Sequence, residues 1–339
     1  MAELRHYTSL RVGGPAKQFI DAHNENEIIA AIESAGDSPI LIIGGGTNIL
    51  VADDGFDGLV IRITNHSLKA EIDACSGATL TIGAGENWDE LVKASIERGF
   101  AGLETLSGIP GTVGATPIQN IGAYGHEVSE FITRVRTYDR EKREIKTFTN
   151  EQCEFSYRNS HFKSHPGRYV IIEVQFQLRI GVESTAITYA ELAKKLEIGV
   201  GEKAPVVATR KAVLELRAAK GMLLNPSDRD SWSAGSFFTN PIIDEAVAAK
   251  LPKGAPRWPQ VDGRVKTSAA WLIENSGIKK GDSLGGARIS TKHILALTNA
   301  ANATAQDIAA LAKSAQKSVA DTFGIILEPE VNLIGLNLQ

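Results

Sequence analysis

The chain has 339 residues, of which 43% are hydrophobic and 22% are charged, and its formal net charge is −4. This composition is typical of a globular protein with a buried core, and the length predicts two or three domains. The slightly acidic balance gives no reason to expect a nucleic-acid partner, although a small phosphorylated ligand could still be held by local groups.

The sequence shows no sign of export or membrane insertion. The first residues, MAELRH, have no apolar stretch of signal-peptide type, and no apolar run is long enough to span a bilayer. Cys75 and Cys153 lie far apart, and no HExxH pattern surrounds His161 and His165. We therefore expect a cytoplasmic protein with no membrane partner, no structural disulfide and no metal site.

Strands and helices alternate through the first third of the chain. Residues 25–35 carry an apolar stripe at helical spacing. Asn87 resembles an N-cap with Glu90 three residues later, which opens a second helix that ends at Gly99. Strands are predicted at residues 39–43, 58–63 and 80–85, the first of them as a buried, β-branched run.

The rest of the chain predicts more strands and several helices. Strands are expected at 135–138, 169–178 and 325–334, and helices at 189–196, 207–220, 266–275 and 304–323. We expect a first domain over residues 1–200, split into two lobes near residue 65, and a second domain over 201–339. The helix at 207–220 would open this second domain, and the last strand would carry Glu330.

Two loops rich in glycine are the clearest functional signal. Glycine lets backbone N–H groups converge on an anion. Neither loop contains Lys or Arg, and GxGxxG spacing is absent, which argues against a P-loop and a Rossmann motif. Either loop alone could be a tight turn, but together they favour the diphosphate of a dinucleotide. The candidate contacts are Gly44, Gly45, Gly46, Thr47 and Asn48, then Gly108, Pro110, Gly111, Thr112 and Gly114, then Asn120, Gly122, Ala123 and Tyr124.

These motifs resemble a known family, UDP-N-acetylenolpyruvoylglucosamine reductase. The resemblance runs nearly end to end and in order. It rests on both glycine loops and on the segments TSLRVGG at 8–14, YRNSHFK at 157–163, GSFF at 235–238 and EPEV at 328–331. It implies an α+β fold, with a two-lobed FAD-binding domain of the p-cresol methylhydroxylase type and a C-terminal α+β substrate domain.

The resemblance also implies the reaction. NADPH would reduce non-covalently bound FAD, and the reduced flavin would convert a UDP-N-acetylglucosamine enolpyruvyl ether to UDP-N-acetylmuramate. This step belongs to peptidoglycan synthesis, and hence to cell-wall biogenesis, cell shape and division. NADPH and the UDP-sugar would use one cleft in turn, and we expect a monomer.

Three residues are the catalytic candidates. Hydride addition to the enol ether builds negative charge on the substrate carboxylate, and the planar guanidinium of Arg158 suits that charge. Ser236 resembles the family's proton donor, and Glu330 its catalytic carboxylate. Each also has an ordinary interpretation: a structural ion pair for Arg158, a turn serine for Ser236 and a solvated strand face for Glu330.

Substrate contacts are implied at four positions. Tyr189 resembles the tyrosine that closes over the nucleotide in one subtype, and Lys220 is the candidate for the diphosphate, although Arg210 and Arg217 on the same helix could simply be solvated. The others are Asn240 and His293. Thr239 stands where many relatives have a lysine, which leaves open how the diphosphate is neutralised.

Other functions stay possible on the sequence alone. A different flavin oxidase or dehydrogenase would share the glycine loops without needing all three catalytic candidates. A nucleotide-sugar-binding protein without redox activity would be colourless when purified. A structural protein of the wall-synthesis machinery has little support, because no exposed heptad or low-complexity arm is present.

Overall fold

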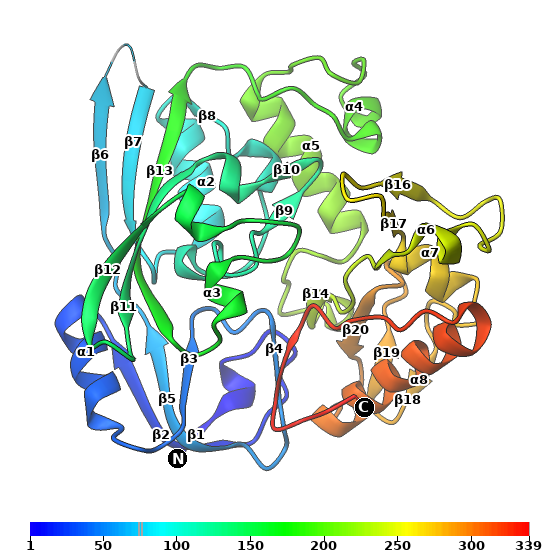
Figure 1. Cartoon of the computed structure of the whole chain (residues 1–339), viewed down its shortest axis with the longest axis horizontal. Helices are drawn as coiled ribbons and strands as arrows, with labels where there is room; N and C mark the ends of the chain where they lie inside the picture. The colour runs from blue at the N-terminus through cyan, green and yellow to red at the C-terminus, as the bar shows by residue number, and fades with distance from the viewer. Residues whose placement is uncertain (74, 76, 339) are drawn as a thin grey trace. The chain divides into compact units, whose positions relative to one another are not determined.

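The computed structural model describes residues 1–73, 75 and 77–338, and they form two compact units. The first unit comprises Ala16–Gly45 and Asp57–Ala219. The second comprises Ala2–Pro15, Gly46–Phe56 and the chain from Lys220 onward. Figure 1 follows the chain through both by colour, from its blue beginning to its red end. Neither unit is therefore continuous in sequence.

The first unit starts with a small sheet. Its strands, in spatial order β2-β5-β3, are β2 (Pro15–Ala22), β5 (Phe56–Ile63) and β3 (Ile40–Ile43), and β3 pairs with β5 in parallel. Helix α1 (Glu25–Ser34) is capped by Asn24, whose side chain accepts the N–H of Glu27 at 3.0 Å. The strand predicted at 39–43 forms as β3, but the expectation that it is buried is met only at Ile43, because β3 lies at the sheet edge and its other residues are partly exposed.

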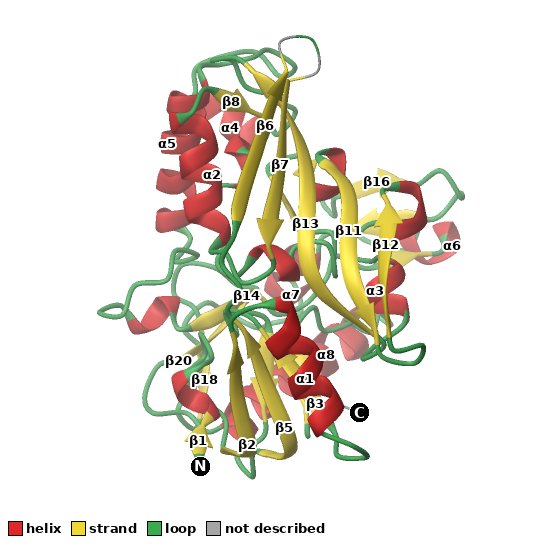
Figure 2. Cartoon of the chain, turned by 90° about the vertical axis from the view of Figure 1, so that its left-hand side faces the viewer, coloured by secondary structure: helices red, strands yellow, loops and turns green. Residues whose placement is uncertain are grey.

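A larger antiparallel sheet fills the rest of the first unit (Figure 2). Helix α2 (Trp88–Glu97) packs against it, with the Trp88 and Phe176 ring centroids 5.9 Å apart. The small sheet ends at Ile63, and this one begins at Leu68. Its strand order is β12-β11-β13-β7-β6, with β8 also paired to β13; the strands are β6 (Leu68–Asp73), β7 (Gly77–Gly83), β8 (Phe100–Ala101), β11 (Ile132–Asp139), β12 (Glu144–Thr149) and β13 (Tyr169–Ile180).

Short elements complete the first unit. Helix α5 belongs here and not in the C-terminal domain, where the boundary at residue 200 placed it. It packs against η2 and α4, so its apolar stripe is covered by this unit. The elements are η2 (Glu104–Leu106), η3 (Val113–Ala115), β9 (Gly122–Ala123), β10 (His126–Glu127), η4 (Val128–Glu130), η5 (Glu151–Cys153), α3 (His161–Ser164), α4 (Ala190–Lys195) and α5 (Val206–Ala219).

The second unit packs three small sheets around its own core. One is antiparallel in the order β14-β20-β19-β18, one is antiparallel in the order β15-β17-β16, and in the last β4 pairs with β21 in parallel. The strands of these three sheets are β4 (Ile49–Val51), β14 (Ser233–Ser236), β15 (Ile242–Ile243), β16 (Arg257–Pro259), β17 (Val265–Thr267), β18 (Ser283–Leu284), β19 (Ala287–Ile289), β20 (Ala296–Asn299) and β21 (Asn332–Ile334). The short strand β1 (Ala2–Glu3) belongs to none of the three.

The helices η6, α7 and α8 of the second unit each begin after a residue whose side chain caps the helix. Helix α8 begins with a capping box, in which Thr304 and Asp307 each accept the other's backbone N–H. The helix predicted from residue 266 begins later, after the N-cap Ser268, because residues 265–267 are strand β17. These elements are η1 (Leu4–His6), η6 (Arg229–Ser231), α6 (Glu245–Ala248), α7 (Ala269–Glu274) and α8 (Ala305–Phe323).

Two further findings concern the chain as a whole. Cys75 and Cys153 are both free, the first exposed and the second buried. Among the described residues, no helix combines the length and the apolar character that crossing a membrane would require.

Candidate active site

The two glycine loops meet in the first unit. A Cβ added to Gly44 would lie 2.2 Å from Thr112 Oγ1, and one added to Gly114 would lie 2.5 Å from the Cβ of Ala84. Both distances are far below ordinary van der Waals contact, so neither position can carry a side chain without a shift. Gly108 and Gly111 have φ values of +71° and +120°, in a region that favours glycine. The loops thus present backbone, as a dinucleotide site requires.

Helices α2 and α5 hold the second glycine loop in place. Trp88 N–H donates to Gly111 O at 3.1 Å, and Gly108 N–H donates to Asp89 Oδ1 at 2.6 Å. Arg217 Nε donates to Gly108 O at 3.1 Å. Burial opposes ionisation of Asp89, but hydrogen bonds from Arg210 and from Gly108 outweigh it and lower the pKa of this carboxyl group. The loop is therefore anchored through both its N–H and its C=O groups.

Arg217 and Arg210 are not solvated, contrary to the ordinary interpretation of a basic helix. Arg217 is 8% exposed, and burial lowers the pKa of its guanidinium. Arg210 forms a bidentate salt bridge with Asp89, in which Nη1 donates to Oδ1 at 2.6 Å and Nη2 donates to Oδ2 at 2.8 Å. The sequence carried a signal for Arg217, because it lies four residues after the buried Val213 and hence on the same helix face.

The first glycine loop passes from one unit to the other between Gly45 and Gly46. Gly46 has φ +61°, and a Cβ there would lie within bonding distance of Tyr7 O. Beyond it, Asn48 Nδ2 donates to the backbone carbonyl of Glu330 at 3.1 Å. In the second unit this predicted cofactor segment therefore directly contacts the segment of a predicted catalytic residue.

Arg158 lies at the tip of a tight turn in the first unit. Ser156 and Asn159 exchange backbone hydrogen bonds of 3.1 Å on either side of it, and Arg158 has φ +53°, a left-handed conformation that costs a non-glycine residue energy. Its side chain donates to Gly122 O at 2.8 Å and to Asn120 O at 3.4 Å. The structure therefore brings the predicted catalytic arginine onto the Asn120–Gly122 part of the predicted cofactor site.

Asn120 itself is a structural anchor for this turn. It is 1% exposed, and its Nδ2 donates to Glu127 Oε2 at 2.6 Å and to Ser156 O at 3.2 Å. Its Oδ1 accepts the N–H of Ser129 at 3.1 Å. Since its side-chain donors and acceptor are used within the chain, Asn120 orders the site through its backbone and its neighbours.

Tyr124 and Tyr189 form an aromatic pair. Their ring centroids are 5.5 Å apart in an edge-to-face arrangement. Tyr124 is buried, and burial raises the pKa of its phenol to about 12, whereas Tyr189 is 43% exposed at the start of α4. The exposed Tyr189 ring thus packs against the buried Tyr124 ring and keeps part of its surface accessible to solvent.

Ser236 and Glu330 come together in the second unit. Glu330 N–H donates to the carbonyl of Phe237, the residue after Ser236, at 2.8 Å. Phe238 and Pro329 form an antiparallel bridge next to it. The last strand is shorter than predicted: β21 begins at Asn332, so Glu330 lies in a bend before the strand and not within it. The bend arises because the backbone here pairs with the Phe237 segment instead of continuing along β4.

The remaining predicted contacts also lie in the second unit. Asn240 Oδ1 accepts the N–H of Ala269 at 3.0 Å, so it helps to start α7. His293 Nδ1 accepts the N–H of Leu295 at 3.2 Å. Thr239 donates both its N–H and its hydroxyl to Glu328 O, at 3.0 and 3.4 Å. Glu328 is exposed.

Comparisons with known proteins bear on the fold and the family of the chain. Residues 16–147 match the family model of an FAD binding domain, and residues 225–334 match that of the C-terminal domain of UDP-N-acetylenolpyruvoylglucosamine reductase. Curated reductases of that name are 48% identical in Cutibacterium acnes and 47% identical in Streptomyces avermitilis. The matches cover 98% and 99% of this chain, and 89% and 95% of the relatives. The chain belongs to the UDP-N-acetylenolpyruvoylglucosamine reductase family.

A solved structure supports the fold of this reductase. The crystal structure of UDP-N-acetylenolpyruvylglucosamine reductase from Thermus caldophilus superposes with a TM-score of 0.67 at 24% identity, covering 98% of this chain and 97% of that one. The expected fold, an FAD-binding domain of the p-cresol methylhydroxylase type followed by a C-terminal domain, is confirmed. The protein is thus a flavin-dependent oxidoreductase of peptidoglycan synthesis that uses FAD.

Proposed function

We propose that this reductase uses NADPH to convert the enolpyruvyl ether of UDP-N-acetylglucosamine to UDP-N-acetylmuramate. The observation that carries the proposal is the hydrogen bond from Glu330 N–H to Phe237 O, which joins the Ser236 and Glu330 segments. This hydrogen bond keeps the backbone of Glu330 close to that of Ser236, and these are the two residues proposed to act on the substrate after hydride transfer.

Arg158 is proposed to stabilise the charge that develops on the substrate carboxylate. When the β-carbon of the ether accepts a hydride, negative charge spreads onto the carboxyl oxygens, and a guanidinium fork matches their geometry. Two carbonyl oxygens, of Gly122 and Asn120, already orient the group. The left-handed turn that carries Arg158 is the kind of local strain that persists where the surrounding structure holds it for function.

Ser236 and Glu330 are proposed to complete the reduction. Ser236 would donate a proton to the α-carbon, a step that a weakly acidic hydroxyl can perform because the carbanion is strongly basic. Glu330 would hydrogen-bond the substrate carboxyl group. Gly235, before Ser236, has φ +75°, a conformation that favours glycine.

The residues of the two glycine loops fit FAD, which when bound supplies the hydride chemistry. Their glycine backbone would contact its diphosphate. We propose that binding is non-covalent, because His126, the histidine that follows the loop, has both ring nitrogens engaged. Nδ1 lies 2.7 Å from Glu130 Oε2, and Nε2 lies 2.9 Å from Ala186 O.

Tyr189, Lys220, Asn240 and His293 are proposed as substrate contacts. The exposed ring of Tyr189 is available to cover a nucleotide, and Thr239 offers no cation for the diphosphate. We further propose that NADPH and the UDP-sugar occupy the same cleft in turn. The cytoplasmic location and the monomeric state stay predictions.

An anaerobic absorbance experiment tests the proposal. NADPH should bleach the flavin bands of the purified protein, and the UDP-enolpyruvyl sugar should restore them. Bleaching without recovery would leave a flavoprotein but refute the substrate. A colourless protein that cannot be reconstituted with FAD would refute the whole proposal and favour a binding protein.

A further inference from the structure

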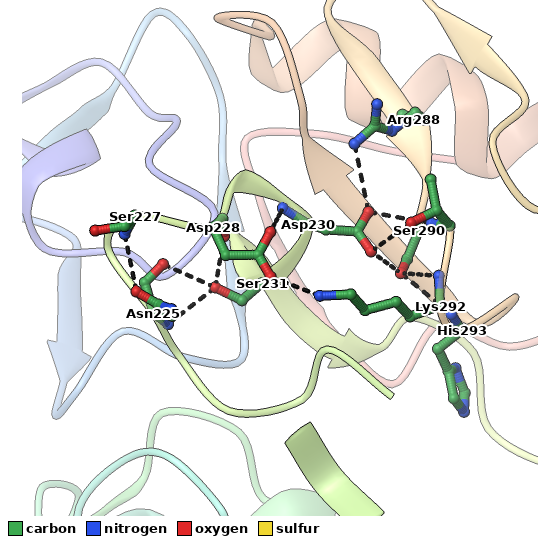
Figure 3. Close-up of polar contacts among 10 residues, drawn as sticks. Asn225, Ser227, Asp228, Asp230, Ser231, Arg288, Ser290, Lys292 and His293 are labelled. Carbon is green, nitrogen blue, oxygen red and sulfur yellow. Dashed lines mark hydrogen bonds and ion pairs between the residues drawn. The ribbon is translucent and has the colours of Figure 1, made fainter. Parts of the chain in front are cut away.

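A polar network in the second unit lies outside the groups assigned so far. It joins residues 225–231, around the short helix η6, to residues 288–293, which comprise the end of β19 and the start of its connection to β20 (Figure 3). We refer to these two segments together as the Asp230 network. One end of it, His293, is a proposed substrate contact, so the network bears on how that contact is placed.

The centre of the network is the carboxylate of Asp230, which is only 6% exposed. It accepts hydrogen bonds from Ser290 Oγ at 2.9 Å and from Thr291 N–H and Oγ1 at 3.1 and 3.0 Å. Arg288 approaches it at 3.4 Å. A buried carboxylate is tolerated only when it is satisfied in this way. Asp230 therefore fixes the conformation of the whole Arg288–Thr291 segment.

Ser290 passes this constraint on to His293. While its hydroxyl donates to Asp230, its oxygen accepts the N–H of Lys292 at 3.0 Å and that of His293 at 3.1 Å. A serine hydroxyl has one donor and two acceptor sites, so all of them are used. Without Asp230 the hydroxyl would be free to rotate, and the backbone of His293 would lose a fixed acceptor.

The orientation of the His293 ring follows. Its Nδ1 accepts the N–H of Leu295 at 3.2 Å, so in the neutral ring the proton is on Nε2. Figure 3 shows the ring pointing away from Asp230 and Lys292. The backbone is held on one side by Ser290 and the ring is held at Nδ1, so the orientation of the ring is tied to this segment.

The network also touches the residue next to Lys220, the proposed diphosphate contact. A Cβ added to Gly221 would lie 3.3 Å from Lys292 Cδ and 3.8 Å from Asp230 Oδ2. Lys292 is in turn held by Asp228, with Nζ 2.6 Å from Oδ2. Gly221, which follows Lys220, and Ser290, which accepts the N–H of His293, thus both lie close to one buried carboxylate.

We propose that Asp230 is a positioning residue for the UDP-sugar: acting through Ser290, it fixes the His293 backbone and thereby the orientation in which the His293 ring meets the ligand. The inference rests on the proposed function. The competing possibility is that Asp230 only stabilises the fold of the second unit, in which case its loss would lower stability without a specific effect on the sugar.

The first test is Asp230→Asn in the full-length holoenzyme. We expect the KM for the UDP-enolpyruvyl sugar to rise about tenfold, which corresponds to the usual coupling between residues of one hydrogen-bonded network. The kcat and the rate of flavin reduction by NADPH should stay within about twofold of wild type. Ser290→Ala, which keeps Asp230 and its bonds to Thr291, should raise the same KM if Asp230→Asn fails to fold.

Asp307→Asn is the matched control. This carboxylate also accepts backbone N–H groups in the second unit, from Thr304 at 3.0 Å and Gly286 at 3.2 Å, but not from the Ser290–His293 segment. It should lower the melting temperature and leave the KM unchanged.

The decisive measurement combines Asp230→Asn with His293→Ala. If Asp230 acts through His293, the double variant has the KM of His293→Ala alone. Independent, multiplying effects of the two substitutions, or an unchanged KM in Asp230→Asn, would overturn the inference while the proposed function stands. A wild-type protein whose reduced flavin is not reoxidised by the sugar would refute the proposed function and this inference with it.

Discussion

Gly44→Ala probes the contact between the two glycine loops. The new methyl group would lie 2.2 Å from Thr112 Oγ1, so one loop must move by about 1 Å to restore ordinary contact. The φ of Gly44 is not positive, so the clash alone determines the effect. Overpacking of this kind costs roughly 1–3 kcal/mol, which corresponds to a fall in melting temperature of about 2–12 °C.

The assay is thermal unfolding of the protein before and after reconstitution with FAD. Gly181→Ala is the control, because it makes the same chemical change in the same unit with no atom within 4 Å of the new Cβ. Thr112→Ala should rescue Gly44→Ala, since it removes Oγ1 and leaves the two Cβ atoms 3.3 Å apart. Gly44→Ala should also weaken FAD binding, because the loop shifts.

Two outcomes would refute this reasoning. If Gly44→Ala and Gly181→Ala melt at the same temperature, the loops do not touch as the structure places them. If Thr112→Ala does not restore the stability of Gly44→Ala, the destabilisation has a different cause.

Three more predictions concern single side chains. Ser236→Ala should lower kcat by about 10²–10⁴-fold, as expected for a lost general acid, without slowing flavin reduction by NADPH in stopped-flow absorbance. Tyr189→Ala should raise the KM for the UDP-sugar and change the melting temperature little, because the ring is exposed, whereas loss of the buried Tyr124 should destabilise the protein. The hydrogen bond to Glu130 raises the pKa of His126, so protonation of His126 stabilises the fold. That contribution is complete below the unfolded pKa of about 6.5 and is lost as the pH rises through the folded pKa. Over this pH window the melting temperature of His126→Gln should therefore depend less on pH than that of the wild type.

The sequence predicted the elements whose signals are local. The N-cap Asn87 could be predicted because an N-cap acts within three residues of itself. The glycine loops were readable because tight turns and close approaches require glycine whatever surrounds them.

Features that depend on distant partners could not be predicted in the same way. The edge position of β3 is set by which strands pair with it, and the bend at Glu330 is set by its hydrogen bond to Phe237. The hydrogen bonds of Asp230 could not be predicted, because its partners come from residues 288–291 and no local sequence pattern indicates the contact. The membership of α5 in the first unit likewise follows from packing against η2 and α4.

The interleaved composition of the second unit has a consequence for biosynthesis. Strand β4 pairs with β21, with Ile49 opposite Asn332. This early strand therefore cannot form its sheet until almost the whole chain has been translated. Asn48 and Leu50 are left without their final neighbours during that time. A fragment expressed from Lys220 onward would lack both early segments, and its exposed core would make it prone to aggregate.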